Sequence, residues 1–138
     1  MERFFQLLLA LCSVGLLSNC AGSGGSASTT NALPPGISSF LVTAPNAPTS
    51  YSINSVMNAS LTLRRGMTYT FNVSASSHPF YIMTIKGTDA SNAYNVGVTN
   101  NGTSAGTISF TVTAGAPNTL YYNCSNHLPM GGSISVIN

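Results

Sequence analysis

YYNCSNHLPMGG, residues 121–132, is the segment around which the rest of the chain is arranged. Three side chains with metal-binding atoms lie within it in the order Cys124, His127 and Met130, so that their spacing is Cys-x2-His-x2-Met. The only other histidine of the chain, His78, lies 46 residues upstream of the cysteine. A thiolate, two imidazoles and a thioether are donors for soft or borderline transition metals. The segment therefore predicts a metal site, provided that the fold brings the distant imidazole to it.

Alternating apolar and polar residues lead into this segment. Leu120 and Tyr122 alternate with Tyr121 and Asn123, which places Cys124 on the inward face of a strand. The same period of two recurs in residues 60–63, 67–73, 107–112 and 134–136. No window shows the period of a helix, and Gly, Pro and Asn interrupt the pattern often, as in proteins built from short strands. The sequence therefore predicts an all-β sandwich or barrel.

Further elements can be assigned from the same pattern. Residues 64–66, Arg-Arg-Gly, predict a turn, and Met67, Tyr69, Phe71 and Val73 are expected to share one buried face. Residues 80–85 are apolar on both faces and predict an interior strand, whereas residues 89–106 are rich in Asn, Gly and Ser and predict a long irregular connection. His78 follows the strand 67–73 in a loop, which a sandwich can place at the same end as the Cys124 loop.

The N-terminal 20 residues have the features of an export signal. Arg3 lies in a short polar start, and an apolar stretch follows from residue 4 to residue 17. This stretch is shorter than the roughly 20 residues that a membrane-spanning helix needs. We therefore expect export to the periplasm or the cell envelope.

The end of the signal predicts how the mature chain begins. LSNC, residues 17–20, resembles the bacterial lipobox, in which the cysteine becomes the lipidated first residue, although Asn19 replaces the small residue that usually precedes it. Cys20 is thus either a lipid anchor or is removed with the signal. Residues 21–36 are rich in Gly, Ser and Ala and predict a flexible linker, so that the folded domain is expected to span residues 37–138.

Composition excludes several functions. The 138 residues include four basic and two acidic side chains, and a net charge of +2 without a basic stripe argues against nucleic-acid binding. Asp89 is the only carboxylate side chain of the mature chain, so that paired-carboxylate and Ser-His-Asp catalysis have no residues to use. We therefore do not expect an enzyme. The hydrophobic fraction of 43% is nevertheless sufficient for a packed core.

Each candidate ligand has an ordinary structural interpretation when it is taken alone. His78 would be a solvated loop residue, Met130 a core side chain, and Cys124 a small buried hydrophobe. After export, however, Cys124 is the only cysteine of the mature domain and has no disulfide partner in an oxidising compartment. Its combination with both histidines and a methionine favours a copper site with a His2Cys plane and a weak axial Met. Zinc also binds His2Cys sets, but the nearby methionine favours copper.

Four residues of this β-rich exported chain resemble, in their order, the ligands of the cupredoxins, which are the type 1 blue copper proteins. They are His78, Cys124, His127 and Met130. The spacing in the C-terminal loop is closest to that of amicyanin, and the loops of plastocyanin and pseudoazurin are longer. The resemblance covers roughly residues 37–138. It implies a Greek-key β-sandwich that binds one copper ion, with the two histidines and the cysteine as equatorial ligands and the methionine as the axial ligand.

One position departs from the family pattern. Many cupredoxins carry Asn directly after the first histidine ligand, where it fastens the two ligand loops together, but this chain has Pro79 there. The resemblance therefore leaves the fastening of the loops to other residues, for which Asn123, Ser125 and Asn126 are the candidates.

These features predict an exported single-copper electron carrier. The exposed pair Leu128 and Pro129 beside His127 would form a small apolar patch for transient docking of a redox partner protein. We expect a monomer that binds no nucleic acid and meets the membrane only through an anchor at Cys20. Two alternatives stay open, namely a copper carrier or storage protein with the same ligands, and a metal-free structural β-sandwich.

Overall fold

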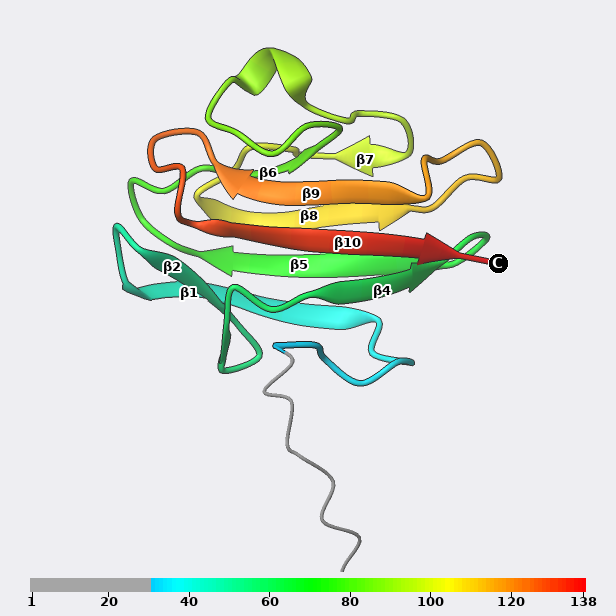
Figure 1. Cartoon of the computed structure of the whole chain (residues 1–138), viewed down its shortest axis with the longest axis horizontal. Coiled ribbons are helices and arrows are strands. Elements are labelled where there is room, and N and C mark those ends of the chain that lie inside the picture. Colours follow the sequence, from blue (N-terminus) through cyan, green and yellow to red (C-terminus); the bar gives the residue numbers. More distant parts are fainter. Residues whose placement is uncertain (1–30) are drawn as a thin grey trace, which may run out of the picture.

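A computed structural model describes residues 31–138 of the chain (Figure 1). The predicted signal, Cys20 and the linker up to residue 30 lie outside the described residues. Among the residues that are described, no helix is both long and apolar enough to span a bilayer. Ala32 forms a parallel bridge with Ser60, and the Leu33 N–H donates to the Ser60 carbonyl at 3.1 Å. Contacts with the folded domain therefore begin upstream of Ile37.

The described chain consists of short strands and one 3-10 turn. In chain order these are β1 (Ser39–Asn46), β2 (Ser50–Ile53), β3 (Val56–Met57), β4 (Leu61–Arg64), β5 (Thr68–Ser74), β6 (Phe80–Met83), η1 (Ala90–Asn92), β7 (Val98–Thr99), β8 (Ala105–Thr111), β9 (Thr119–Cys124) and β10 (Gly131–Ile137). The strands form a six-stranded sheet in the order β3-β2-β1-β5-β8-β7 and a four-stranded sheet in the order β4-β10-β9-β6. The prediction of an all-β fold is confirmed.

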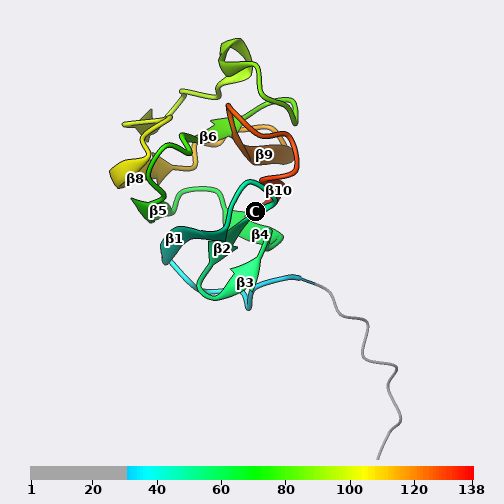
Figure 2. The same ribbon diagram turned by 90° about the vertical axis from the view of Figure 1, so that its left-hand side faces the viewer.

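The two sheets pack face to face, and the chain crosses repeatedly between them (Figure 2). Strands β4, β6 and β9 each follow a strand of the other sheet, which gives the predicted Greek-key sandwich. Most neighbouring strands are antiparallel, but β1 is parallel to β5 and β4 is parallel to β10. Aromatic side chains join the sheets in the core, where the rings of Phe71 and Phe80 lie 5.6 Å apart.

The alternation of the sequence corresponds to the observed burial. Leu61 and Leu63 in β4 are buried and alternate with the exposed Thr62 and Arg64. The turn predicted at residues 64–66 begins one residue later, at residues 65 and 66, because Arg64 still belongs to the strand. Tyr69, Phe71 and Val73 in β5 are buried as expected. Met67, which was expected on the same buried face, is 50% exposed. It lies between the turn and β5, outside the regular strand, and lines a surface pocket.

Strand β6 is at an edge of the four-stranded sheet, so that the prediction of an interior strand for residues 80–85 was wrong. Its outer side is covered by the connection that follows it. The amide of Asn101 pairs with Ile82 as another strand would, accepting from its N–H at 2.8 Å and donating to its carbonyl at 3.1 Å. The Tyr94 N–H donates to the same carbonyl at 2.8 Å. This cover explains an apolar strand at an edge, and Ile85 beyond it is 60% exposed.

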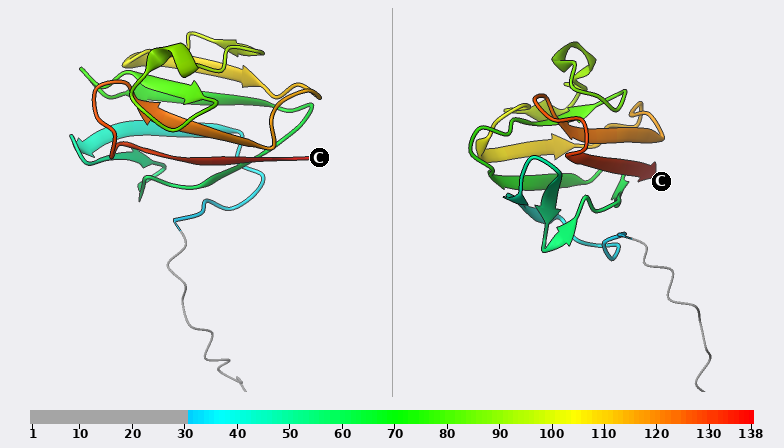
Figure 3. Two further views of the ribbon diagram at one scale, coloured as in Figure 1. Left: turned by 45° about the horizontal axis from the view of Figure 1, so that its top comes forward. Right: turned by 60° about the vertical axis from the view of Figure 1, so that its left-hand side comes forward.

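The predicted irregular connection, residues 89–106, is largely irregular. It contains the single turn η1 and the two-residue strand β7, and its last two residues begin β8. Asp89 caps η1, because its carboxylate accepts from the Ser91 N–H at 2.9 Å. The views in Figure 3 show this connection beside β6, on the side away from β4.

Candidate metal centre

The two loops that carry the candidate ligands lie at the same end of the sandwich (Figures 1 and 2). One connects β5 to β6 and contains His78, and the other connects β9 to β10 and contains His127. Strands β6 and β9 are antiparallel neighbours, with Phe80 opposite Cys124. Since His78 is two residues before Phe80, this register holds the first loop directly beside the cysteine.

Three donor atoms converge at this end. The Nδ1 atoms of His78 and His127 are 3.2 Å apart, and they lie 3.8 and 3.7 Å respectively from the Cys124 Sγ. Among the described residues, these three side chains form a group able to hold a metal ion, with all donor atoms within 4.8 Å of one another. The structure therefore brings the mid-chain histidine to the C-terminal pair.

The size of this triangle fits a metal ion. The point equidistant from the three atoms lies about 2.1 Å from each, which matches metal–nitrogen and metal–sulfur bonds of roughly 2.0–2.3 Å in protein sites. Both histidines present the same nitrogen, Nδ1, to this point. Two imidazoles and one thiol thus already have the spacing of a trigonal ligand plane.

Met130 is adjacent to this triangle through its backbone. The Cys124 N–H donates to the Met130 carbonyl at 2.8 Å, and the Met130 N–H donates to the His127 carbonyl at 3.1 Å. The side chain of Met130 is fully buried. The tight turn therefore holds the backbone of Met130 beside those of Cys124 and His127.

Exposure differs among the donors. Cys124 is a free, fully buried cysteine, whereas His78 and His127 are half-buried. Leu128, which follows the second histidine, is 56% exposed, and Pro129 is also exposed. The sulfur is thus shielded from solvent, while the surface next to His127 is apolar.

The sulfur receives one backbone hydrogen bond, from the Asn126 N–H at 3.4 Å. The side-chain amide of Asn126 also donates to the Ser77 carbonyl at 3.0 Å, across 49 residues of sequence. A weaker tie runs from the Ser125 N–H to the Pro79 carbonyl at 3.4 Å. Asn126 and Ser125 therefore fasten the two loops, in the absence of an Asn after His78.

Asn123 braces the C-terminal loop from inside. It is fully buried, although the alternation placed it on the outward face, because the loop folds back over it. Its amide nitrogen donates to the carbonyls of Cys124, His127 and Leu128 at 3.1, 3.3 and 3.4 Å. Its Oδ1 has no hydrogen-bond partner among the described residues.

Gly131 begins β10 against this buried amide, and substitution there tests how tightly the loop is packed. A Cβ at this position would clash with the Asn123 Oδ1 and with the Tyr122 carbonyl oxygen. Gly131→Ala is expected to lower the free energy of unfolding by about 1–3 kcal/mol through overpacking. Urea denaturation measures the loss. Gly115→Ala is the matched control, because a Cβ there meets no atom within 4 Å; equal stability of both variants would contradict this packing.

Tyr51 in β2 is a site residue that the sequence did not indicate. It is fully buried, and its hydroxyl lies 2.8 Å from the His78 carbonyl oxygen and 3.0 Å from that of Pro79. Burial, and after it the neighbouring Cys124, raises the pKa of the Tyr51 phenol above its ordinary value. The phenol therefore stays protonated and remains a donor. Every residue of β2 is buried, so that no alternation distinguishes this tyrosine from core side chains.

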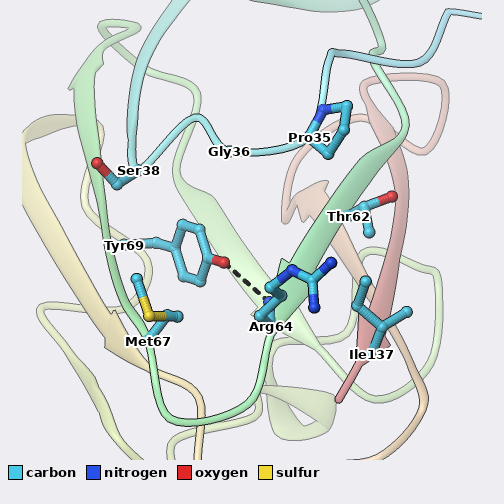
Figure 4. Close-up of a pocket in the computed structure, with 8 residues that line it drawn as sticks. All are labelled: Pro35, Gly36, Ser38, Thr62, Arg64, Met67, Tyr69 and Ile137. Atoms are coloured by element: carbon cyan, nitrogen blue, oxygen red, sulfur yellow. Dashed lines mark hydrogen bonds between the residues drawn. The ribbon is translucent and has the colours of Figure 1, made fainter.

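A pocket lies at the other end of β5 from the His78 loop (Figure 4). Its lining is Pro35, Gly36, Ser38, Thr62, Arg64, Met67, Tyr69 and Ile137. The Tyr69 hydroxyl points toward β4, where it accepts from the Arg64 backbone N–H at 2.8 Å. This pocket includes none of the candidate ligands and is separate from the metal centre.

The sandwich has the cupredoxin fold, as the comparison with solved structures shows. Reduced rusticyanin is similar to this chain with a TM-score of 0.51 at 20% identity, over 76% of this chain and 82% of that one. Rusticyanin from Thiobacillus ferrooxidans matches with a TM-score of 0.51 at 20% identity, over 76% and 80% of the two chains. A third structure, described as the copper protein rusticyanin, gives 0.52 at 21% identity with 76% and 80% coverage. The sequence matches no family model and no curated protein.

Proposed function

We propose that this chain is a type 1 blue copper protein and acts as a single-copper electron carrier. His78, Cys124 and His127 would hold the ion in a plane, with Met130 as the weak axial ligand. The observation that carries the proposal is the triangle of two Nδ1 atoms and one Sγ, with sides of 3.2, 3.7 and 3.8 Å. The similar structure described as a copper protein has the same fold and supports this choice of metal.

Copper, when bound, supplies one-electron exchange between Cu(I) and Cu(II), whose preferred ligands differ. The chain would hold a mixed ligand set in one geometry, because Cys124 ends a strand, Phe80 pairs with it, and the two ligand loops are bonded together. Thiolate and thioether suit Cu(I), whereas imidazole serves both states. A ligand set that is fixed in this way rearranges little when the electron moves.

The surroundings of the site favour electron transfer over catalysis. Cys124 and Met130 are fully buried, which keeps water from their sulfur atoms. The exposed apolar surface at Leu128 and Pro129, beside the half-buried His127, would dock a redox partner over a small area. The low net charge of the chain argues against strong electrostatic steering of that partner.

Export and anchoring belong to the same proposal. Residues 1–20 would direct the chain to the periplasm or cell envelope, with residues 21–36 as a tether for the domain 37–138. Mass spectrometry of the mature protein tests whether its first residue is a lipidated Cys20. A mature chain that begins elsewhere without lipid would support export by plain cleavage and exclude the anchor.

Reconstitution distinguishes the electron carrier from the alternatives. The purified protein is titrated with Cu(II), and its visible spectrum is recorded through cycles of chemical reduction and reoxidation. We expect one copper per chain, an intense thiolate-to-copper absorption, and its reversible loss on reduction. A colourless protein that binds Cu(I) alone would favour copper transport or storage, and a protein that binds no copper at stoichiometry would favour a structural sandwich.

The axial role of Met130 predicts a mild variant. Met130→Leu conserves volume and is expected to keep the intense absorption, because the thioether binds weakly, while the reduction potential changes. Potentiometric titration of both proteins measures the change. An unchanged potential would show that the thioether does not interact with the metal.

The tie between the ligand loops can be tested at its exposed residue. Asn126→Ala removes the bond to the Ser77 carbonyl and keeps the backbone N–H that faces Cys124, and we expect about tenfold weaker binding of Cu(II). Competition with a chelator measures the affinity. Ser125→Ala is the control in the same loop, because the Ser125 hydroxyl meets only Asn126, at 3.5 Å, among the described residues. Equal affinities of the two variants would contradict a role for the tie.

A further inference from the structure

The backbone of His78 is held on both sides by hydrogen bonds. Its N–H donates to the Ala75 carbonyl at 2.9 Å, which closes a turn in which Ser77 has a φ of +64°. This is the left-handed region, which residues other than glycine seldom adopt. On the other side, the His78 carbonyl accepts from the Tyr51 hydroxyl at 2.8 Å. The backbone that carries the His78 imidazole is therefore held by hydrogen bonds on both sides of the His78 Cα.

Pro79 makes the second of these bonds important. Proline has no N–H, so that the His78–Pro79 peptide cannot donate to a neighbouring strand. The carbonyl groups of His78 and Pro79 still need hydrogen-bond donors where the fold covers them. For the His78 carbonyl, the Tyr51 hydroxyl is the donor that the described residues provide. The Pro79 carbonyl shares that hydroxyl at 3.0 Å and receives a longer bond from the Ser125 N–H.

The ring of Tyr51 is held as firmly as its hydroxyl. It is fully buried and meets Phe80 edge-on, with ring centroids 5.1 Å apart and an interplanar angle of 67°. Phe80 lies opposite Cys124 across the sheet. One tyrosine thus connects the histidine loop, the strand that follows it and the strand that ends in the cysteine. Because the Tyr51 side chain is fixed, its hydrogen bond to the His78 carbonyl can also fix the position of the His78 imidazole.

We propose that Tyr51 is a positioning residue, which holds the His78 imidazole at the spacing that the metal needs by bonding to the peptide carbonyls of residues 78 and 79. The inference rests on the proposed copper site. It extends that site to β2, a strand that contributes no ligand. It also implies that the His78 side of the ligand triangle is preformed before the metal arrives.

Tyr122 offers a matched comparison for Tyr51. Both side chains are fully buried, and the Tyr122 hydroxyl also donates to a backbone carbonyl, that of Ala59, at 2.8 Å. The two tyrosines differ in their acceptors, because Tyr51 donates to carbonyls of the His78 loop, whereas Ala59 is not in a ligand loop. Loss of the Tyr122 hydroxyl therefore removes a similar hydrogen bond without releasing the histidine.

The experiment compares Tyr51→Phe with Tyr122→Phe, since each keeps the ring and removes only the hydroxyl. For the copper-loaded proteins, we expect Tyr51→Phe to weaken Cu(II) binding about tenfold or more and to alter the visible and electron paramagnetic resonance spectra. Tyr122→Phe is expected to stay within about twofold of the unmodified chain in affinity, with the same spectra.

A second measurement needs no copper. Amide hydrogen exchange of the metal-free proteins is followed at His78 and, as a report of global unfolding, at Phe71 in the core. In Tyr51→Phe the His78 amide is expected to exchange at least about tenfold faster relative to Phe71 than in Tyr122→Phe. The same relative exchange in both variants would overturn the inference, even if both bind copper. Failure of the unmodified chain to bind copper would instead overturn the proposed function, and the exchange measurement would still decide the role of Tyr51.

Discussion

Replacement of Cys124 by serine is expected to abolish the intense visible absorption of the copper-loaded protein. The absorption arises from charge transfer between a thiolate and Cu(II), and a serine hydroxyl supplies no such electron pair. Because Cys124 is also the donor that suits Cu(I), we expect the affinity for copper to fall by more than about a hundredfold, beyond the usual effect of a supporting residue. Absorption spectra and chelator competition measure both changes.

The substitution itself is mild for the fold. Serine is close to cysteine in size, and the polar neighbours of the fully buried Sγ are the two histidines, the Asn126 N–H and the Tyr51 phenol. Ser125→Ala in the same loop is the control and is expected to keep the absorption. Persistence of the blue absorption in Cys124→Ser would show that its source is another group.

Truncation of Phe80 is expected to destabilise the fold strongly. Phe80 is fully buried, stacks on Tyr122 with ring centroids 5.0 Å apart, and meets Tyr51 edge-on. Phe80→Ala is expected to lower the free energy of unfolding by about 3–5 kcal/mol, through lost burial and the cavity that remains. Urea denaturation of the metal-free protein measures the loss.

The same variant should also disturb the metal centre, because Phe80 lies opposite Cys124 and follows the His78 loop. Phe110→Ala is the matched control, since Phe110 is equally buried but lies in β8 opposite Tyr69, toward the other end of β5. We expect similar losses of stability in both variants and weakened copper binding only in Phe80→Ala. Equal copper affinities would show that the aromatic core does not support the site.

Much of the fold could be predicted because one face of most strands is buried. Alternation alone identified the core positions of β5, β8 and β10 and the inward direction of Cys124. The predictions from alternation were wrong at positions where burial depends on segments that are distant in the sequence. Met67 lies just before β5 and is half exposed, and β6 is apolar at an edge because Asn101 and its connection cover it. Which segment covers an edge strand depends on the tertiary fold, and no periodic pattern in the sequence reveals it.

The candidate ligands could be predicted for a different reason. Histidine and cysteine are rare in this chain, so that the order of His78, Cys124 and His127 carried the information. The convergence of these residues depends on the β6–β9 register, which sequence spacing does not determine. Tyr51 could not be predicted at all, because its role depends on which carbonyls the folded chain places above a strand that is buried on both faces.

The central claim is that His78, Cys124 and His127 bind one copper ion. Crystals of the copper-loaded protein, measured with X-rays at the copper absorption edge, test this claim most directly. We predict a single strong anomalous peak within the triangle of the two Nδ1 atoms and the Sγ, at roughly 2.0–2.3 Å from each. A copper-loaded crystal with its peak elsewhere, or with the Cys124 sulfur outside bonding distance of the metal, would contradict the proposed centre.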